Sequence, residues 1–399
     1  MRSMKWKLAL LATATAAFMV GCGGGGADQT SQRAGITSVK VFGDSLADSG
    51  AFKGTPGYGR IFSVQDSASE PNTIWTERIA AILGAPQLCN FFKYAGADAA
   101  PFATVAGCSS YAIGRGRINN INPQTGAGAS PFSITYQLQI ASSAGNYKST
   151  DLLLIIGGGN DAADLVSAYL NAAKDGGASY VAIAGSLIPA ATLGPMLAGG
   201  QAGLAQIGGA YMVALADKLY GSIKTSALDK GAERIAVLNM PGITNTPRFQ
   251  MVLNGIAAAY GGGATGAGAR NQSEALFKSW VEAFNARLAT LVANDKRVLL
   301  VDFYTPFNDQ LANPEQYGLT NVKTPACPIA GVGSDGLPSY NFQTCTAATL
   351  SAMTPPAGAT GGANWWQTYL FSDGFHPTPL GHQLLSQLVA KSLATAGWL

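Results

Sequence analysis

Four short segments, rich in apolar residues without alternation, constrain the fold of this chain more than any other feature. In chain order they are VKVF (39–42), DLLLII (151–156), RIAVLN (234–239) and RVLLVDF (297–303). Strands that are covered on both faces of a parallel sheet have continuous apolar sequences of this kind. Segments with the apolar spacing of helices lie between or after them, at 75–83, 275–294 and about 379–396. The alternation predicts an α/β sandwich with a parallel sheet.

The composition is that of a globular protein. Hydrophobic residues make up 47% of the 399 residues and charged residues only 12%, which excludes a disordered chain. The formal net charge of +3 lacks the strong positive excess of nucleic-acid-binding proteins, so we expect no nucleic-acid partner. No repeat and no charged linker interrupts the sequence. We therefore expect one domain over residues 36–399.

The first 22 residues have the pattern of an export signal, with basic residues followed by the apolar stretch LALLATATAAFMV. The stretch is too short to predict a membrane span. It ends in MVGC, which resembles a bacterial lipoprotein processing box and implies lipid attachment at Cys22; ordinary secretory cleavage nearby is the alternative. Residues 23–35 begin with GGGG and are predicted to be a flexible tether. By resemblance to Gram-negative lipoprotein sorting, Gly23 favours the outer membrane, with a periplasmic or secreted form as the alternative.

Four further cysteines, Cys89, Cys108, Cys327 and Cys345, form two pairs that are close in sequence. Four cysteines allow three pairings, and the sequence does not choose between them. Local pairing is the simplest, because each bond would close a loop rich in glycine, serine and proline. An even number of cysteines in an exported protein favours disulfides over metal ligands. We expect no metal site.

The stretch 176–216 contains no charged residue and is mostly apolar. Prolines and glycines interrupt it, which argues against a membrane span. It is either packing around the core or a mobile apolar flap over a site, and packing is the simpler interpretation.

Two short sequence motifs contain a serine and a histidine–aspartate pair. Ser45 follows the first predicted strand, in GDSL (43–46). A serine hydroxyl needs a base to take its proton and an acid to orient that base. The chain has only two histidines. His376 lies in the turn DGFH (373–376) with Asp373, whereas His382 begins the last helix, where we expect a capping or packing role.

The second predicted strand is followed by GGND (158–161). Ligands bind at the carboxyl ends of the strands of α/β sheets, so we expect Asn160 to face the site and donate its amide to a developing oxyanion. Asp161 is predicted to cap the helix that follows.

These three motifs together resemble the GDSL, or SGNH, hydrolase family of serine esterases and lipases, in the order of that family. The form FGDSLADSG is similar to its secreted bacterial lipase branch. The resemblance implies a flavodoxin-like three-layer α/β/α fold, with no metal and no organic cofactor. It implies Ser45 as the nucleophile, Asp373 and His376 as its partners, and an oxyanion hole formed by the Ser45 N–H, Asn160 and a backbone N–H from a second block.

That second block differs from the family pattern NYAxGGA. The corresponding sequence is SYAIGRGRI (110–118), in which Ser110 replaces an asparagine and Arg115 one of the paired glycines. The backbone donor is therefore Gly114 or Arg115, and we predict Gly114. The side chains of Arg115 and Arg117 either contact an anionic group of the substrate or lie in an exposed basic loop, which is commoner.

The resemblance predicts an exported serine ester hydrolase that forms an acyl-enzyme. Low charge and the apolar stretch favour aliphatic or lipid-like esters, including phospholipids and polyesters. A glycan O-acetyl esterase and a lipid acyltransferase are the enzymatic alternatives, and a non-catalytic surface lipoprotein that serves as a binding module is the alternative from another class. We expect membrane association through the lipid anchor, and the sequence leaves the oligomeric state open.

Overall fold

The computed structural model describes residues 35–66, 71–96 and 102–399, all of which belong to one compact unit. The predicted signal peptide, including Cys22, and nearly all of the predicted tether lie outside the described residues.

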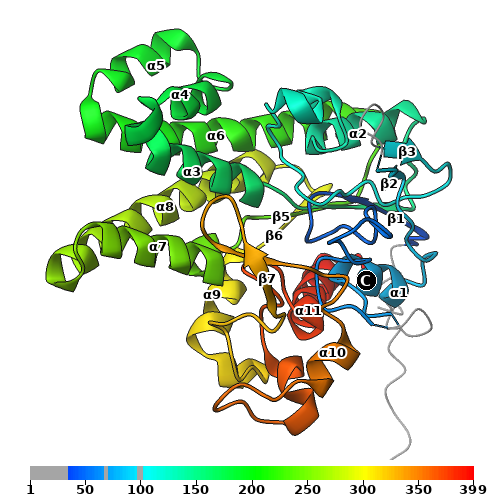
Figure 1. Cartoon of the computed structure of the whole chain (residues 1–399). Coiled ribbons are helices and arrows are strands. Elements are labelled where there is room, and N and C mark those ends of the chain that lie inside the picture. Colours follow the sequence, from blue (N-terminus) through cyan, green and yellow to red (C-terminus); the bar gives the residue numbers. More distant parts are fainter. Residues whose placement is uncertain (1–34, 67–70, 97–101) are drawn as a thin grey trace, which may run out of the picture. The chain divides into compact units, whose positions relative to one another are not determined.

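A four-stranded parallel sheet forms the centre of the described unit (Figure 1). Its strands lie in the order β1 (Ser38–Phe42), β4 (Asp151–Ile155), β5 (Ile235–Leu238) and β6 (Val298–Val301). Each of the apolar segments singled out in the sequence therefore forms a strand, as predicted.

The segment that contains the second block runs along the free edge of β1. Ser110 forms a parallel bridge with Val41, whose N–H donates to Ser109 and whose carbonyl accepts from Tyr111, at 3.0 and 2.7 Å. With this segment counted as an edge strand, the spatial order becomes that of flavodoxin-like sheets. The second block is thereby held directly beside the strand that leads to Ser45.

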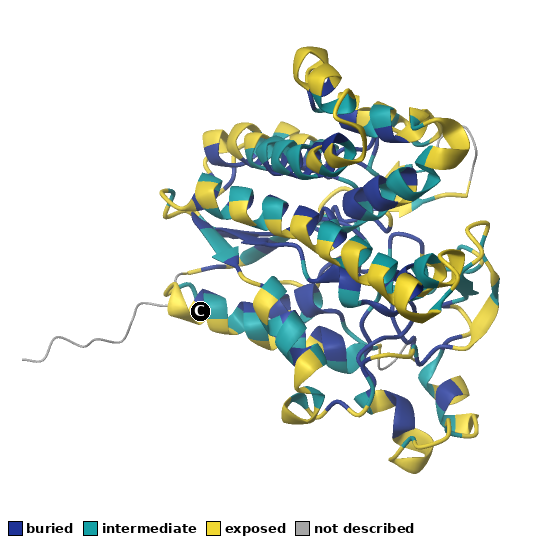
Figure 2. Ribbon diagram, turned by 90° about the vertical axis from the view of Figure 1, so that its left-hand side faces the viewer, coloured by how far each residue is buried: buried dark blue, intermediate teal, exposed yellow. Residues whose placement is uncertain are grey.

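Alternate side chains of the strands pack into two separate layers of helices. On one face Leu153 and Ile155 pack with α2 (Ile134–Ser143), α3 (Gly159–Asp175), α6 (Gly200–Ser226) and α8 (Gly263–Val292). On the other face Leu152 and Leu154 pack with α1 (Trp75–Ile82) and α11 (Pro379–Thr395). Figure 2 shows the sheet buried between helices whose outer faces are exposed. This is the predicted three-layer α/β/α fold.

The remaining elements are peripheral. They are α7 (Pro247–Ala259), α9 (Tyr304–Ala312), α10 (Ala347–Ala352), the hairpin strands β2 (Phe92–Tyr94) and β3 (Phe102–Thr104), the hairpin strands β7 (Ile329–Val332) and β8 (Pro338–Tyr340), and the 3-10 turns Pro123–Thr125, Ala127–Ala129, Leu228–Lys230, Ile243–Asn245, Pro314–Tyr317 and Gly362–Thr368.

Helix α8 begins well before the predicted start at residue 275, inside a glycine-rich stretch. A Cβ at Gly266 would lie 2.4 Å from the carbonyl oxygen of Ala257 on α7. Gly266 therefore allows the two helices to approach closely.

The uncharged stretch 176–216 forms α4 (Ala178–Gly185), α5 (Ala190–Leu197) and the first part of α6. Tyr180, Ala184 and Leu193 are buried in the same apolar cluster as the sheet, while most of the neighbouring side chains are exposed. No residue of the stretch lines the cavity described below. The stretch 176–216 therefore packs against the core, and it does not cover the cavity as a flap would. None of the described helices is both long enough and apolar enough to cross a membrane.

Both disulfides join cysteines that are close in sequence. Cys89 is bonded to Cys108 beside the β2–β3 hairpin, and Cys327 is bonded to Cys345 in a small apolar cluster with Trp365 and Trp366. These are the local pairings. Closing a loop of this length stabilises a fold by roughly 3 kcal/mol in the chain-entropy model.

Candidate active site

Ser45 lies in the turn at the carboxyl end of β1. The turn is tight because a Cβ at Gly43 would lie 2.6 Å from the carbonyl oxygen of Ile156. The side chain of Gln137 on α2 holds it, since its amide accepts from Gly43 N–H at 2.8 Å and donates to Gly43 C=O at 2.9 Å. Glycine at this position brings the chain close to β4 and leaves Ser45 half-buried at the sheet edge.

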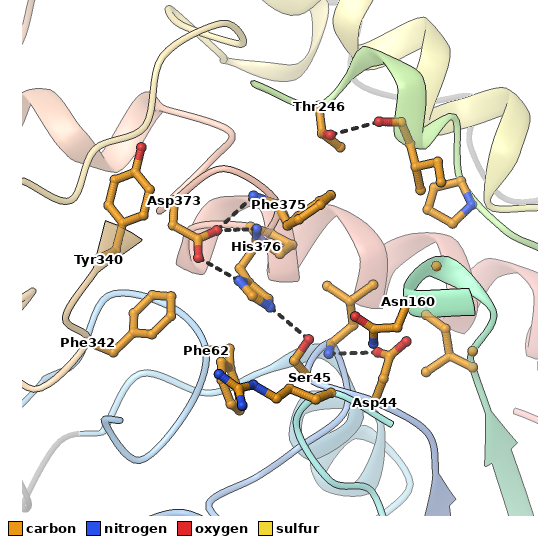
Figure 3. Close-up of a pocket in the computed structure, with 18 of the residues that line it drawn as sticks. Asp44, Ser45, Phe62, Asn160, Thr246, Tyr340, Phe342, Asp373, Phe375 and His376 are labelled. Carbon is orange, nitrogen blue, oxygen red and sulfur yellow. Dashed lines mark hydrogen bonds and ion pairs between the residues drawn. The ribbon is translucent and has the colours of Figure 1, made fainter. Parts of the chain in front are cut away.

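The hydroxyl of Ser45 is hydrogen-bonded to His376, and His376 to Asp373 (Figure 3). The Oγ–Nε2 distance is 2.7 Å, and the distance from Nδ1 to Oδ2 of Asp373 is 2.8 Å. The other carboxylate oxygen accepts the backbone N–H groups of Phe375 and His376, at 2.8 and 2.7 Å. A single four-residue turn therefore holds acid and base together, and the structure brings all three predicted residues into contact.

Asp373 is buried, which by itself would raise its pKa. The electrostatic interaction with His376 and the hydrogen bonds from His376 and Phe375 outweigh burial and hold the pKa of Asp373 below its ordinary value. An ionised Asp373 keeps the proton of His376 on Nδ1 and leaves Nε2 free to accept the Ser45 hydroxyl proton. The arrangement can activate an alcohol for attack on an acyl carbonyl.

Asn160 lies on the first turn of α3 and lines the same cavity as Ser45. Its Nδ2 donates to the carbonyl of Gly116 at 3.0 Å, so one of its two N–H bonds orients the amide and the other is available to a ligand. Gly158 has a φ of 102° in the connection from β4, and this conformation makes the sharp entry into α3 possible.

Asp161 does not cap α3, contrary to the prediction. Gly158 occupies the cap position, and no side chain caps the helix. The buried carboxylate of Asp161 instead accepts the N–H groups of Ile118 and Asn119, at 2.9 and 2.8 Å. Burial raises its pKa to about 6, so it is ionised at neutral pH. Its role is to hold the second-block segment against α3.

The prediction of Gly114 as an oxyanion donor is wrong. Its N–H already donates to Oδ2 of Asp48 at 2.7 Å, and it lies buried against the ring of Phe62. Arg115 lines the cavity, with a φ of 66°, and no acceptor among the described residues meets its N–H. The available backbone donor of the second block is therefore the N–H of Arg115.

Two buried aspartates of the GDSLADSG segment were not anticipated. Asp48 accepts N–H groups from Gly50 and Ala51, at 2.9 and 2.7 Å, in addition to Gly114. Asp44 accepts from Leu46 at 3.0 Å and lines the cavity beside Ser45. Burial raises the pKa of each to about 6. The sequence did contain a signal for these turns, because aspartates next to small residues after a strand commonly accept backbone N–H groups.

His382 is a packing residue. It is 1% exposed within α11, and neither ring nitrogen has a hydrogen-bond partner among the described residues. Burial lowers its pKa to about 3, so the ring is neutral at physiological pH.

The cavity above Ser45 has a volume of about 400 Å³ and largely apolar walls. The aromatic lining residues are Tyr58, Phe62, Phe303, Phe307, Tyr340, Phe342 and Phe375. The rings of Phe62 and Phe342 contact the imidazole of His376, with centroids 5.2 and 5.7 Å apart. Because these side chains come from distant segments, no local motif indicated the wall. In the described part of the chain, no group of three or more histidine, cysteine, aspartate or glutamate residues could hold a metal ion.

Comparison with known proteins gives the same assignment as the geometry. The family model described as GDSL-like Lipase/Acylhydrolase matches residues 39–389. The chain is also similar to the anther-specific proline-rich protein APG of Brassica napus, with 26% identity over 161 residues. That match covers 40% of this chain and spans only 30% of the plant protein. Because the family model covers most of the sequence and the strand-end motifs meet at one site, the chain belongs to the GDSL-like lipase/acylhydrolase family.

Proposed function

We propose that this protein is an exported serine ester hydrolase that cleaves carboxylic esters through an acyl-enzyme on Ser45. The observation that carries the proposal is the unbroken series of hydrogen bonds from Asp373 through His376 to Ser45, at the base of an apolar cavity. Membership of a family of ester hydrolases supports the same reaction class.

In the first step Ser45 Oγ attacks the ester carbonyl and Nε2 of His376 takes the hydroxyl proton. The negative charge that develops on the carbonyl oxygen meets the N–H groups of Ser45 and Arg115 and the Asn160 amide. The N–H groups of Ser45 and Arg115 donate to no acceptor among the described residues, and one N–H of the Asn160 amide remains available beside its bond to Gly116. The amino end of α3 adds its positive dipole.

In the second step His376 gives its proton to the leaving alcohol, and the C–O bond of the ester breaks. Water then attacks the acyl group on Ser45, with His376 again as the base, and free carboxylic acid leaves. A non-catalytic binding module has no need of this arrangement, which argues against that alternative.

The cavity supports aliphatic or lipid-like acyl groups. Its volume of about 400 Å³ lies within the range of small-molecule sites, and its walls are largely apolar and include several aromatic side chains. An acetyl group alone would leave most of this surface in contact with water.

Export rests on the composition of the first 22 residues, and two disulfides are in keeping with an oxidising compartment. We further propose a lipid anchor at Cys22. Mass spectrometry of the mature protein purified from membranes tests it: a diacylated N-terminal cysteine is expected, and an unmodified N-terminus at another residue would contradict it.

Hydrolysis of p-nitrophenyl esters from acetyl to palmitoyl, with the mature protein and its Ser45→Ala variant, tests the reaction. Activity with an optimum at medium or long chains that disappears in the variant is expected. A sharp acetyl optimum would favour the glycan esterase, and activity that Ser45→Ala retains would refute the proposed nucleophile. Release of p-nitrophenol that occurs only when an alcohol is added, with a new ester as the product, would favour an acyltransferase.

A further inference from the structure

Arg115 adopts a backbone conformation that suits glycine. Its φ of 66° lies in the left-handed region, which side chains other than asparagine and aspartate rarely enter. Any residue supplies the backbone N–H that this position offers to the oxyanion, and glycine would do so without strain. The arginine side chain therefore calls for a separate explanation.

The guanidinium of Arg115 lies on the wall of the catalytic cavity. Its carbon lies 5.8 Å from the ring centroid of Tyr58, which packs against Phe62 at 5.9 Å. Phe62 in turn contacts His376. Gly116, the next residue, packs against the backbone of Gly43 and Asp44, so this wall lies directly beside the nucleophile turn.

Arg115 differs from its neighbour Arg117 in its charge partners. Arg117 forms an ion pair with Asp164 on α3, with an Nη2–Oδ1 distance of 2.9 Å. No carboxylate among the described residues pairs with Arg115. Asp44 and Asp373 also line the cavity, but each accepts hydrogen bonds within its own turn.

We infer that Arg115 binds an anionic oxygen group, a carboxylate or a phosphate, of the ester substrate; the inference rests on the proposed hydrolase function. The guanidinium carbon lies over the ring of Tyr58, and the Arg115 side chain donates no hydrogen bond to another described residue, so its N–H groups are available for two parallel hydrogen bonds to such a group. Arg115 is also exposed, so water and salt partly screen this pair. The cavity would then accept amphipathic esters, with an apolar portion against the aromatic rings and a negative charge at Arg115.

The kinetic test compares esters that share one butyryl group. Monobutyrin is neutral, 1-butyryl-glycerol 3-phosphate carries a phosphate, and butyryloxyacetate carries a carboxylate on the alcohol side. Because all three form the same acyl-enzyme, differences in kcat/KM report on recognition before deacylation. Monomethyl glutarate, compared with methyl butyrate, places the carboxylate on the acyl side. The anionic ester whose kcat/KM most exceeds that of its neutral counterpart identifies the type and position of the anionic group.

The variants are Arg115→Gly, which relieves the backbone strain, and Arg115→Gln, which keeps a long polar side chain without charge. Arg297→Gln is the matched control, because it removes the same charge from the opposite end of the sheet, where Arg297 pairs with Asp295. We expect the anionic-to-neutral ratio of kcat/KM to fall about 10- to 100-fold in both Arg115 variants and to stay within about twofold in the control. An equal change for neutral and anionic esters would overturn the inference and leave the hydrolase standing.

A binding measurement separates this inference from turnover. Ser45→Ala protein is titrated calorimetrically with 1-butyryl-glycerol 3-phosphate and with butyryloxyacetate, with and without Arg115→Gln. The second substitution should weaken binding of one of them about 10-fold or more, and added salt should narrow the difference. If Arg115→Gln leaves the affinity for each of the two ligands unchanged, the inference is contradicted. Absence of ester hydrolysis by the unmodified protein, with binding intact, would refute the proposed function instead.

Discussion

The catalytic turns and the cavity wall of this protein are built in different ways. The turns at 43–46 and 373–376 are short and contain local hydrogen bonds, as between Asp373 and the N–H groups of Phe375 and His376; the first turn is also held by Gln137 on α2. The wall combines aromatic side chains from segments that are distant in sequence, and Tyr340 and Phe342 lie inside a loop closed by the Cys327–Cys345 disulfide. The difference suggests that local sequence determines the chemistry and long-range packing determines the substrate.

The largest effect is expected within the turn at 373–376. Asp373→Asn keeps the size of the side chain but removes the charge that holds His376 in the correct tautomer, so kcat should fall by about 10⁴-fold. Combining it with Ser45→Ala should add little, since the residues act as a unit. Steady-state kinetics on a p-nitrophenyl ester measures both variants, with the melting temperature as a control for folding. Additive losses would show that these residues do not act together.

A smaller effect is expected at the donor that comes from α3. Asn160→Ala removes the amide that is oriented by Gly116, and kcat should fall about 10²–10³-fold, with little change in KM. The same kinetics measures it. A loss confined to KM would mean that Asn160 binds substrate without stabilising the transition state.

The two disulfides offer a matched test of the wall. Replacing Cys327 and Cys345 with serine should cost roughly 3 kcal/mol of unfolding free energy and weaken the preference for longer acyl chains. Replacing Cys89 and Cys108 should cost a similar amount without changing that preference, because none of the described residues between them lines the cavity. Urea unfolding and the ester chain-length profile measure the two effects. An equal change of preference in both double variants would remove the distinction between turns and wall.

The smallest effect concerns acid stability beside the catalytic turn. The folded state keeps His382 neutral down to a pKa of about 3, whereas the unfolded chain binds a proton below its ordinary value of 6.5. The unfolded state therefore binds more protons in this interval, and His382 lowers stability as the pH falls, by about 2 kcal/mol at pH 5.

The buried Asp44, Asp48 and Asp161 act in the opposite direction, since their raised pKa values mean that the folded state gains protons below about pH 6. The diagnostic quantity is therefore the difference between the unmodified protein and His382→Leu. Urea unfolding at pH 7 and pH 5 should show a smaller acid loss in the variant, and parallel curves would contradict the buried, neutral state of His382.

The sheet and the catalytic turns could be predicted because their signals are local. Continuous apolar runs indicated the four strands, and the motif at 373–376 contains both the acid and the base. The second-block donor could not be chosen correctly, because the N–H of Gly114 is taken by Asp48, a contact between residues far apart in sequence. The early start of α8 was missed because its first turns contain glycines, which have low helix propensity, and the close contact of Gly266 with α7 is not visible in the sequence.

The most direct test of the account is labelling with a fluorophosphonate, which reacts only with an activated serine. Intact-mass and peptide mass spectrometry should find one adduct, located on Ser45, and His376→Ala should slow its formation strongly although Ser45 is still present. A folded protein that stays unlabelled, or an adduct that persists after Ser45→Ala, would contradict the claim that Ser45 is the nucleophile of this site.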